Sequence, residues 1–198
     1  EIGVPVAREA HEEPGTVVPT GRNDRRLRHD AVVRHRRDVI ALAAGDGYRL
    51  NCDLYVPKTN QRCPAIIAIH GGAWRTGTKF SMTRHARFLA RRGYVVMAIN
   101  YRHAPEFKFP AQIHDCKHAV RWLRHNADEY NADPDQVIAY GYSAGGHLAC
   151  LLGTTSAADG LEGTPAAGME GYSTRVQAVI AGGAPCEFSW LKPESRGL

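Results

Sequence analysis

The chain has 198 residues, 43% of them hydrophobic and 23% charged, which is typical of a globular protein of about one domain. The formal net charge of +5 is carried by residues 21–37, which hold seven Arg against two Asp. The remainder is balanced, which excludes a basic nucleic-acid-binding face on the folded part. No apolar run approaches the roughly 20 residues of a transmembrane helix, so a membrane span is excluded too.

Residues 1–33 show no sustained period and are treated as an unassigned basic leader, and residues 34–198 form the predicted domain. The leader is predicted to be a solvated, mobile segment rather than a contact for an anionic partner. No signal-peptide pattern is visible, but the chain begins with Glu1 rather than Met. Two localisations therefore stay open, cytoplasmic or secreted after loss of an N-terminal segment, and the oligomeric state is open as well.

The first predicted elements are strands and one helix. Two β-like runs flank a turn rich in glycine, and a nearly all-apolar run indicates a strand buried on both faces. The helix has small and apolar residues on one side and a glycine after its end. In chain order these elements are strands 36–43 and 48–56 around Gly45-Asp46-Gly47, strand 64–70 and helix 81–92.

The second half alternates strands and helices. The predicted elements are strand 94–100, helix 111–130, a turn at 131–135, strand 137–140, helix 144–152, a loop at 153–173 and a last strand at 175–181. Alternation of this kind predicts an α/β fold with a mostly parallel sheet covered on both faces and right-handed crossovers. The N-terminal hairpin adds antiparallel strands to it.

The stretch VIAYGYSAGGHLACLL at 137–152 places a serine between a strand and a helix. Its Gly141-Tyr142-Ser143-Ala144-Gly145 segment has the G-x-S-x-G arrangement, in which a sharp turn lifts the serine hydroxyl clear of the sheet. The neighbours must be small to let the chains pass, and the helix N-terminus points at the site. Ser143 is therefore the candidate nucleophile.

A second motif follows the strand at 64–69. His70-Gly71-Gly72-Ala73-Trp74 contains two glycines that let successive backbone N–H groups face one point. An acyl-transfer enzyme needs such donors where a carbonyl oxygen becomes an oxyanion. Taken alone, the motif is equally compatible with an ordinary tight turn.

From Arg36 onward the sequence resembles the α/β-hydrolase fold, and in particular carboxylesterases of the hormone-sensitive-lipase type and their bifunctional feruloyl/acetyl-xylan esterase relatives. The resemblance rests on four stretches in the family's order and spacing: HGGAW (70–74), NYRHAPEFKFPAQIHDCKHAVRWL (100–123), NADPDQV (131–137) and GYSAGGHLA (141–149). Ala73 departs from the third glycine of many members, but its backbone N–H remains.

The resemblance implies roles for individual residues. The oxyanion hole is expected from the amides of Gly72, Ala73 and Ala144, with His70, Gly71, Gly141 and Gly145 in support. Trp74 and Tyr142 are candidates for the acyl pocket, although Trp74 could equally pack the loop. Tyr101 and Arg102 either organise the floor of the site or belong to a hydrogen-bonded turn.

In this fold the triad runs Ser, Asp or Glu, then His. The only histidine after Ser143 is His147, which is expected to pack beside its helix rather than act as the base. The acids after Ser143 occupy no clear triad position; they are Asp159, Glu162, Glu170, Glu187 and Glu194. The resemblance therefore implies truncation at the C-terminus, with the acid and the histidine expected beyond Leu198, on the order of 60 residues or more being absent.

The last strand supports this expectation, because it is apolar on nearly both faces and would be left as an unpaired edge. The 198-residue chain alone is therefore expected to be poorly soluble or oligomeric. Its five cysteines lack metal or disulfide spacing and are interpreted as reduced and structural; they are Cys52, Cys63, Cys116, Cys150 and Cys186.

The predicted function is serine-dependent hydrolysis of a short-chain carboxylic ester, with no metal or cofactor. The resemblance implies an acylated carbohydrate, acetyl or feruloyl, as one substrate class. Two alternatives stay open: an amidase or peptidase of the same fold, and a catalytically incomplete hydrolase that serves as a binding module.

Overall fold

The computed structural model describes residues 33–41 and 48–189. Its strands are β1 (Val33–Ala41), β2 (Arg49–Pro57), β3 (Cys63–Ile69), β4 (Val95–Ile99), β5 (Ala132–Tyr142) and β6 (Ala178–Gly182). Its helices are α1 (Thr83–Ala90), α2 (Ala111–His125) and α3 (Ala144–Thr154), with short 3-10 helices η2 (Lys79–Met82) and η3 (Ala157–Asp159). The predicted turn at 45–47 and the leader at 1–32 lie outside the described residues.

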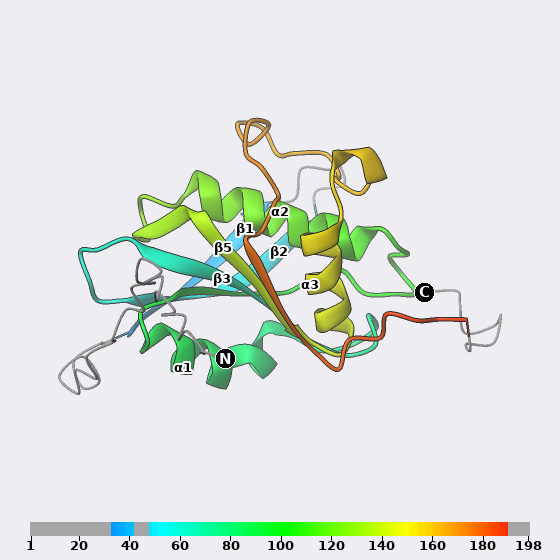
Figure 1. The fold of residues 1–198 in the computed structure, drawn as a ribbon, viewed down its shortest axis with the longest axis horizontal. Helices are drawn as coiled ribbons and strands as arrows, with labels where there is room; N and C mark the ends of the chain where they lie inside the picture. Colours follow the sequence, from blue (N-terminus) through cyan, green and yellow to red (C-terminus); the bar gives the residue numbers. More distant parts are fainter. Residues whose placement is uncertain (1–32, 42–47, 190–198) are drawn as a thin grey trace, which may run out of the picture.

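The strands form one mixed sheet in the order β1-β2-β4-β3-β5-β6 (Figure 1). β1 pairs with β2, and β2 with β4, in antiparallel register, whereas β3 pairs in parallel with both β4 and β5. β6 continues the parallel part beside β5. The predicted doubly wound sheet with an antiparallel N-terminal hairpin is confirmed.

Helices cover both faces of this sheet. α2 and α3 lie on one face and α1 on the other (Figure 1). On the α2/α3 side the core contains Ile67, Met97, Ile113, Val120 and Leu148, all at most 1% exposed. The core under α1 is smaller and is built around Ile66, Val96, Ala86 and Ala90. Because alternate side chains of β3 and β4 enter different cores, both strands are apolar throughout.

Three element boundaries differ clearly from the sequence prediction. The turn predicted at 131–135 is mostly strand, because β5 already begins at Ala132, which pairs with Cys63 of β3. The predicted helix 111–130 ends at His125, since the chain closes a turn in which the Ala132 amide donates to the Ala127 carbonyl at 2.9 Å. The last strand begins at Ala178 rather than 175, because the Arg124 guanidinium holds the carbonyls of Ser173 and Arg175 outside the sheet.

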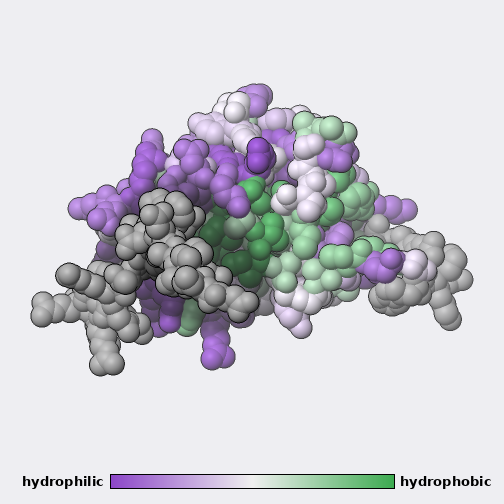
Figure 2. All heavy atoms as spheres, viewed as in Figure 1, coloured by the Kyte–Doolittle hydropathy of each residue, from purple (hydrophilic) through white to green (hydrophobic). Residues whose placement is uncertain are grey.

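β6 lies at one end of the sheet, where β5 is its neighbour among the described strands. Its Val179 and Ile180 side chains are 36% and 51% exposed. Figure 2 shows hydrophobic residues gathered at the centre of the viewed face, in the region of β6 and α3 in Figure 1. In the described part of the chain, no helix is long and apolar enough to cross a membrane.

Candidate active site

Ser143 lies at the turn between β5 and α3, with a backbone φ of 54° and ψ of −124°. A non-glycine residue at positive φ is strained by roughly 1–3 kcal/mol and persists only where its surroundings enforce it. Here the Ser143 amide donates to the Gly182 carbonyl at 2.8 Å, and the Ser143 carbonyl accepts from the His147 amide at 3.0 Å. The sharp turn predicted from G-x-S-x-G is therefore present.

The glycines on either side of the serine are needed for packing. A Cβ on Gly141 would lie 2.1 Å from the Gly145 carbonyl oxygen, and one on Gly145 would lie 2.2 Å from the Ile69 carbonyl oxygen. Real Cβ atoms do not approach backbone oxygens this closely. The first turn of α3 can therefore lie directly on the ends of β3 and β5 only because both positions are glycine.

The loop after β3 lies against the serine. A Cβ on Gly71 would be 3.2 Å from the Ser143 Cβ and 2.9 Å from the Tyr142 carbonyl oxygen. Gly72, Ala73 and Trp74 follow in succession at φ values of 130°, 51° and 58°. Three consecutive residues at positive φ make an unusual turn, in which the peptide groups are rotated away from extended geometry.

The amides in this turn are available as donors. Within residues 33–41 and 48–189, no hydrogen bond is donated by the amides of Gly72 or Ala73, whereas the Gly72 carbonyl accepts from Arg75 and Thr76, each at 3.0 Å. The first amides of a helix have no partner within it, which applies to Ala144 at the start of α3. Their assignment to an oxyanion hole stays a prediction.

The His70 side chain holds the 70–74 loop by a hydrogen bond. Its side chain is fully buried, Nδ1 lies 2.8 Å from the Gly71 carbonyl oxygen, and its ring stacks on Tyr101 at 4.3 Å. Nδ1 must carry the proton to donate to that carbonyl. Burial, opposed by this hydrogen bond and aided by nearby His103, lowers the pKa of His70 to about 4. His70 is thus a neutral ring that is hydrogen-bonded to the loop, and its support of an oxyanion hole stays a prediction.

Tyr101 and Arg102 make the hydrogen-bonded turn that was one of their two predicted roles. The Tyr101 hydroxyl donates to the His70 carbonyl at 3.1 Å. The Arg102 guanidinium grips the buried Asp115 carboxylate through Nη2 at 2.7 Å and Nε at 3.0 Å, and the Arg102 amide donates to the same group at 2.8 Å. The segment after β4 is thus tied to α2 beneath the candidate site.

Trp74 contacts α3 and the segment that follows β6. Its ring meets His147 edge-on at 5.3 Å and Phe188 at 5.9 Å, and His147 also meets Phe188 edge-on at 5.4 Å. Burial lowers the pKa of His147, which packs between two aromatic rings as predicted. Tyr142 is 65% exposed and lies over Gly182 and Gly183. A place for Trp74 or Tyr142 in the acyl pocket stays a prediction.

The sequence analysis missed three residues that shape the candidate site: Gly77, Asp115 and Phe188. A Cβ on Gly77 would lie 2.5 Å from the Gly71 carbonyl oxygen, so Gly77 lets the chain return under the loop. Asp115 was recognisable as a carboxylate next to Cys116 in the buried stripe of a helix, which requires a partner. Nothing in the sequence indicates the contact of Phe188 with Trp74.

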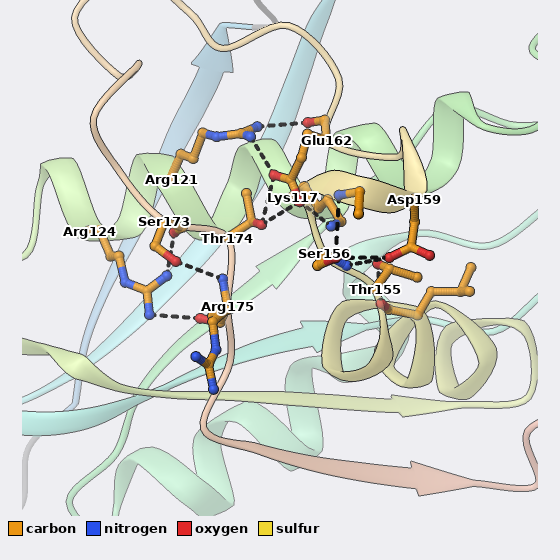
Figure 3. Close-up of polar contacts among 12 residues, drawn as sticks. Lys117, Arg121, Arg124, Thr155, Ser156, Asp159, Glu162, Ser173, Thr174 and Arg175 are labelled. Atoms are coloured by element: carbon orange, nitrogen blue, oxygen red, sulfur yellow. Dashed lines mark hydrogen bonds and ion pairs between the residues drawn. The ribbon is translucent and has the colours of Figure 1, made fainter.

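Three of the acids that follow Ser143 have other partners, whereas Glu170 is exposed and Glu194 lies outside the described residues. Glu162 accepts from Lys117, Arg121 and Thr174, which fastens the loop after α3 to α2 (Figure 3). Asp159 caps the 3-10 helix η3 by accepting from the Ser156 amide at 2.7 Å, and Glu187 accepts from the Ser189 amide. Among the described residues, no group of three or more His, Cys, Asp or Glu side chains could hold a metal ion.

Comparison with known proteins defines the class. Residues 52–196 match the family model described as BD-FAE, and the chain belongs to this family. In structure it resembles an esterase from Thermogutta terrifontis with bound butyrate, at a TM-score of 0.66 and 27% identity over 83% of this chain and 58% of that one. The fold is that of the α/β hydrolases.

Curated relatives match part of the chain. The chain is 39% identical over 59% of its length to a probable carboxylic ester hydrolase, LipM, of Mycobacterium tuberculosis. It is 36% identical over 52% of its length to an arylesterase of Saccharolobus solfataricus. The matches span 26% and 34% of the length of these two relatives.

Proposed function

We propose that this chain carries the nucleophile and oxyanion hole of a serine esterase that hydrolyses short-chain carboxylic esters. One observation carries the proposal: Gly71 allows the 70–74 loop to lie against Ser143, and the Gly72 and Ala73 amides donate no hydrogen bond within the described residues. Such donors are needed beside an attacking serine. The names of the relatives, which are esterases and carboxylic ester hydrolases, support the same reaction.

In the proposed reaction the Ser143 hydroxyl oxygen attacks the ester carbonyl carbon. The carbonyl oxygen gains negative charge and accepts hydrogen bonds from the Gly72, Ala73 and Ala144 amides, and the positive end of the α3 dipole adds to this stabilisation. Collapse of the tetrahedral intermediate expels the alcohol and leaves an acyl-enzyme, which water hydrolyses. The base that receives the serine proton, and the acid that orients it, are proposed to lie outside these 198 residues.

A short acyl group is the proposed substrate feature. Butyrate is bound in the similar Thermogutta terrifontis esterase, and propionate in another structure of that protein. Acetyl or feruloyl groups on a carbohydrate are the substrates that the sequence resemblance implies.

The test is ester turnover by the full-length protein that contains this chain. Ser143→Ala is expected to lower kcat for a 4-nitrophenyl acetate-type substrate by roughly 10⁴-fold or more, because the acyl-enzyme cannot form. Ser81→Ala, at an exposed serine in η2, is the matched control and should retain the parent rate. A parent rate in Ser143→Ala would refute the proposal. Faster turnover of the corresponding amide would favour the amidase alternative instead.

A further inference from the structure

The five cysteines do not share one environment. Cys52, Cys63 and Cys116 are buried, Cys150 is half-buried on α3, and Cys186 is exposed in the segment 183–189 that follows β6. All five are free thiols in the structure. Cys186 is therefore the exposed thiol among the five.

β6 and the start of the segment after it pack along α3. A Cβ on Gly146 would lie 3.0 Å from the Gly182 carbonyl oxygen and 3.1 Å from the Ala184 Cβ, and one on Gly153 would lie 2.4 Å from a Val179 methyl. Small residues along this side of α3 thus allow a close approach of the two segments.

This approach brings two thiols together. Ala184 lies against Gly146, and the Phe188 ring meets the His147 ring at 5.4 Å. Cys186, between Ala184 and Phe188, is therefore held beside the turn of α3 that carries Cys150. Burial raises the pKa of the Cys150 thiol, and the neighbouring Cys186 raises it further. Cys150 is therefore held as a protonated, partly shielded thiol beside an accessible one. Two cysteines 36 positions apart in the sequence thus lie beside each other, which is the first requirement for an internal disulfide.

We propose that Cys150 and Cys186 are a redox-active thiol pair that closes to an intramolecular disulfide on reaction with a low-molecular-weight disulfide. The pair differs from the other three cysteines in that one member is exposed and the other is half-buried, whereas the other three are buried. Neither thiol belongs to the proposed esterase machinery.

The chemistry is two successive thiol–disulfide exchanges. The Cys186 thiolate attacks one sulfur of the small disulfide, forming a mixed disulfide and releasing one small thiolate. Cys150 then gives up its proton to solvent, and its thiolate attacks the Cys186 sulfur and releases the second small thiolate. The two cysteines are oxidised by two electrons in total, and the small disulfide is reduced to two thiols.

Closure would fasten the segment 183–189 to α3. Two residues beyond Cys186, Phe188 packs against Trp74 of the 70–74 loop and against His147 of α3. The disulfide would therefore restrain a segment that touches the loop next to Ser143. Amide hydrogen exchange in residues 183–189 should slow after oxidation, and it should return to its original rate after reduction.

Oxidised glutathione is the probe for the test. The full-length protein is treated under native conditions, its remaining thiols are alkylated after denaturation, and it is digested with trypsin without reduction. Cleavage after Lys and Arg, but not before Pro, puts Cys150 alone in peptide 125–175 and Cys186 alone in peptide 176–196. The expected product is these two peptides joined, without glutathione, and separated again by reductant.

Two variants test the order of the steps. Cys150→Ser should stop the reaction at a stable glutathione adduct on Cys186, whereas Cys186→Ser should leave Cys150 unmodified. Cys63→Ser, at a buried thiol elsewhere, is the control and should give the joined peptides as the parent does. The parent protein alone is already decisive. A persistent glutathione adduct on Cys186, two copies of peptide 176–196 joined to each other, or both cysteines recovered alkylated would each overturn the proposal.

Discussion

The residue on which the proposed chemistry depends is held in a strained conformation. Ser143 has φ of 54°, in a region that glycine adopts at little cost and other residues adopt at roughly 1–3 kcal/mol. Surrounding contacts maintain this conformation: the hydrogen bond from the Ser143 amide to the Gly182 carbonyl, and the close approach of Gly141 to Gly145. At this position stability and the proposed function are therefore in opposition.

Ser143→Gly should be more stable than Ser143→Ala by about 1 kcal/mol, although both should be inactive. Glycine relieves the strain, and this gain exceeds the roughly 0.4–1 kcal/mol that its extra freedom in the unfolded chain costs. Urea unfolding of the two variants measures the difference. At exposed Arg87 in α1, an ordinary helical position, the order should reverse, with Gly about 1 kcal/mol less stable than Ala. Equal stabilities at position 143 would contradict the strain.

His70 should make stability depend on pH. Burial lowers its pKa to about 4 in the folded protein from 6.5, so between these values the unfolded chain binds more protons and the free energy of unfolding rises with pH. His70 should contribute about 3 kcal/mol to this rise. In His70→Asn, whose side-chain amide can still donate to the Gly71 carbonyl, the slope between pH 4 and 6.5 should be smaller. An unchanged slope in urea titrations would argue against a neutral His70.

At the scale of elements, Glu162 joins the loop after α3 to α2 (Figure 3). Its carboxylate accepts from Lys117, which is fully buried, and from Arg121 Nη2 at 2.6 Å and Thr174 Oγ1 at 2.8 Å. Removing its charge leaves the buried Lys117 ammonium without its carboxylate. Glu162→Gln should therefore lower the free energy of unfolding by about 2 kcal/mol. Glu170→Gln, on an exposed part of the same loop, should change it by less than about 0.5 kcal/mol.

The contribution of Glu162 to the free energy of unfolding should also disappear in acid. Burial alone would raise the pKa of its carboxyl, but the hydrogen bonds from Lys117 and Thr174 and the charges of Lys117 and Arg121 outweigh burial, and the pKa falls below its ordinary 4.5. A carboxylate with a lowered pKa stabilises the fold above that value and loses its effect as pH falls through the folded pKa. The stability gap between the parent and Glu162→Gln should thus be constant above pH 5 and narrow below 4.5. A gap that widened in acid would contradict this assignment.

At the scale of the whole molecule, the fold was predictable because its signals are local. All-apolar strands alternating with helices specify the parallel part of the sheet, and the glycines at 141 and 145 specify the turn at Ser143. The end of α2 was not predictable, because residues 126–130 are compatible with a helix and a turn bond to Ala132 stops it. The pairing of Arg102 with Asp115 and the packing of Phe188 on Trp74 depend on long-range contacts that no local pattern encodes.

The exposed edge of the sheet should control self-association. Val179 and Ile180 of β6 are 36% and 51% exposed, and an apolar strand edge is a template for another strand. A polypeptide of these 198 residues should therefore elute from a sizing column as oligomers, and Ile180→Lys should shift it toward monomer. Phe88→Lys changes an equally exposed apolar residue on α1 and should have no such effect. A monodisperse monomer of the parent polypeptide would contradict this account.

The central claim is that Ser143 is a nucleophile, and covalent labelling tests it most directly. The full-length protein is treated with a fluorophosphonate, digested with trypsin, and fragmented to locate the modified residue in peptide 125–175, which contains Ser143. The account predicts one phosphonyl group on Ser143, formed in parallel with the loss of ester turnover and absent in Ser143→Ala. Turnover that persists without a label on Ser143, or a label on another residue that follows the loss of activity, would contradict it.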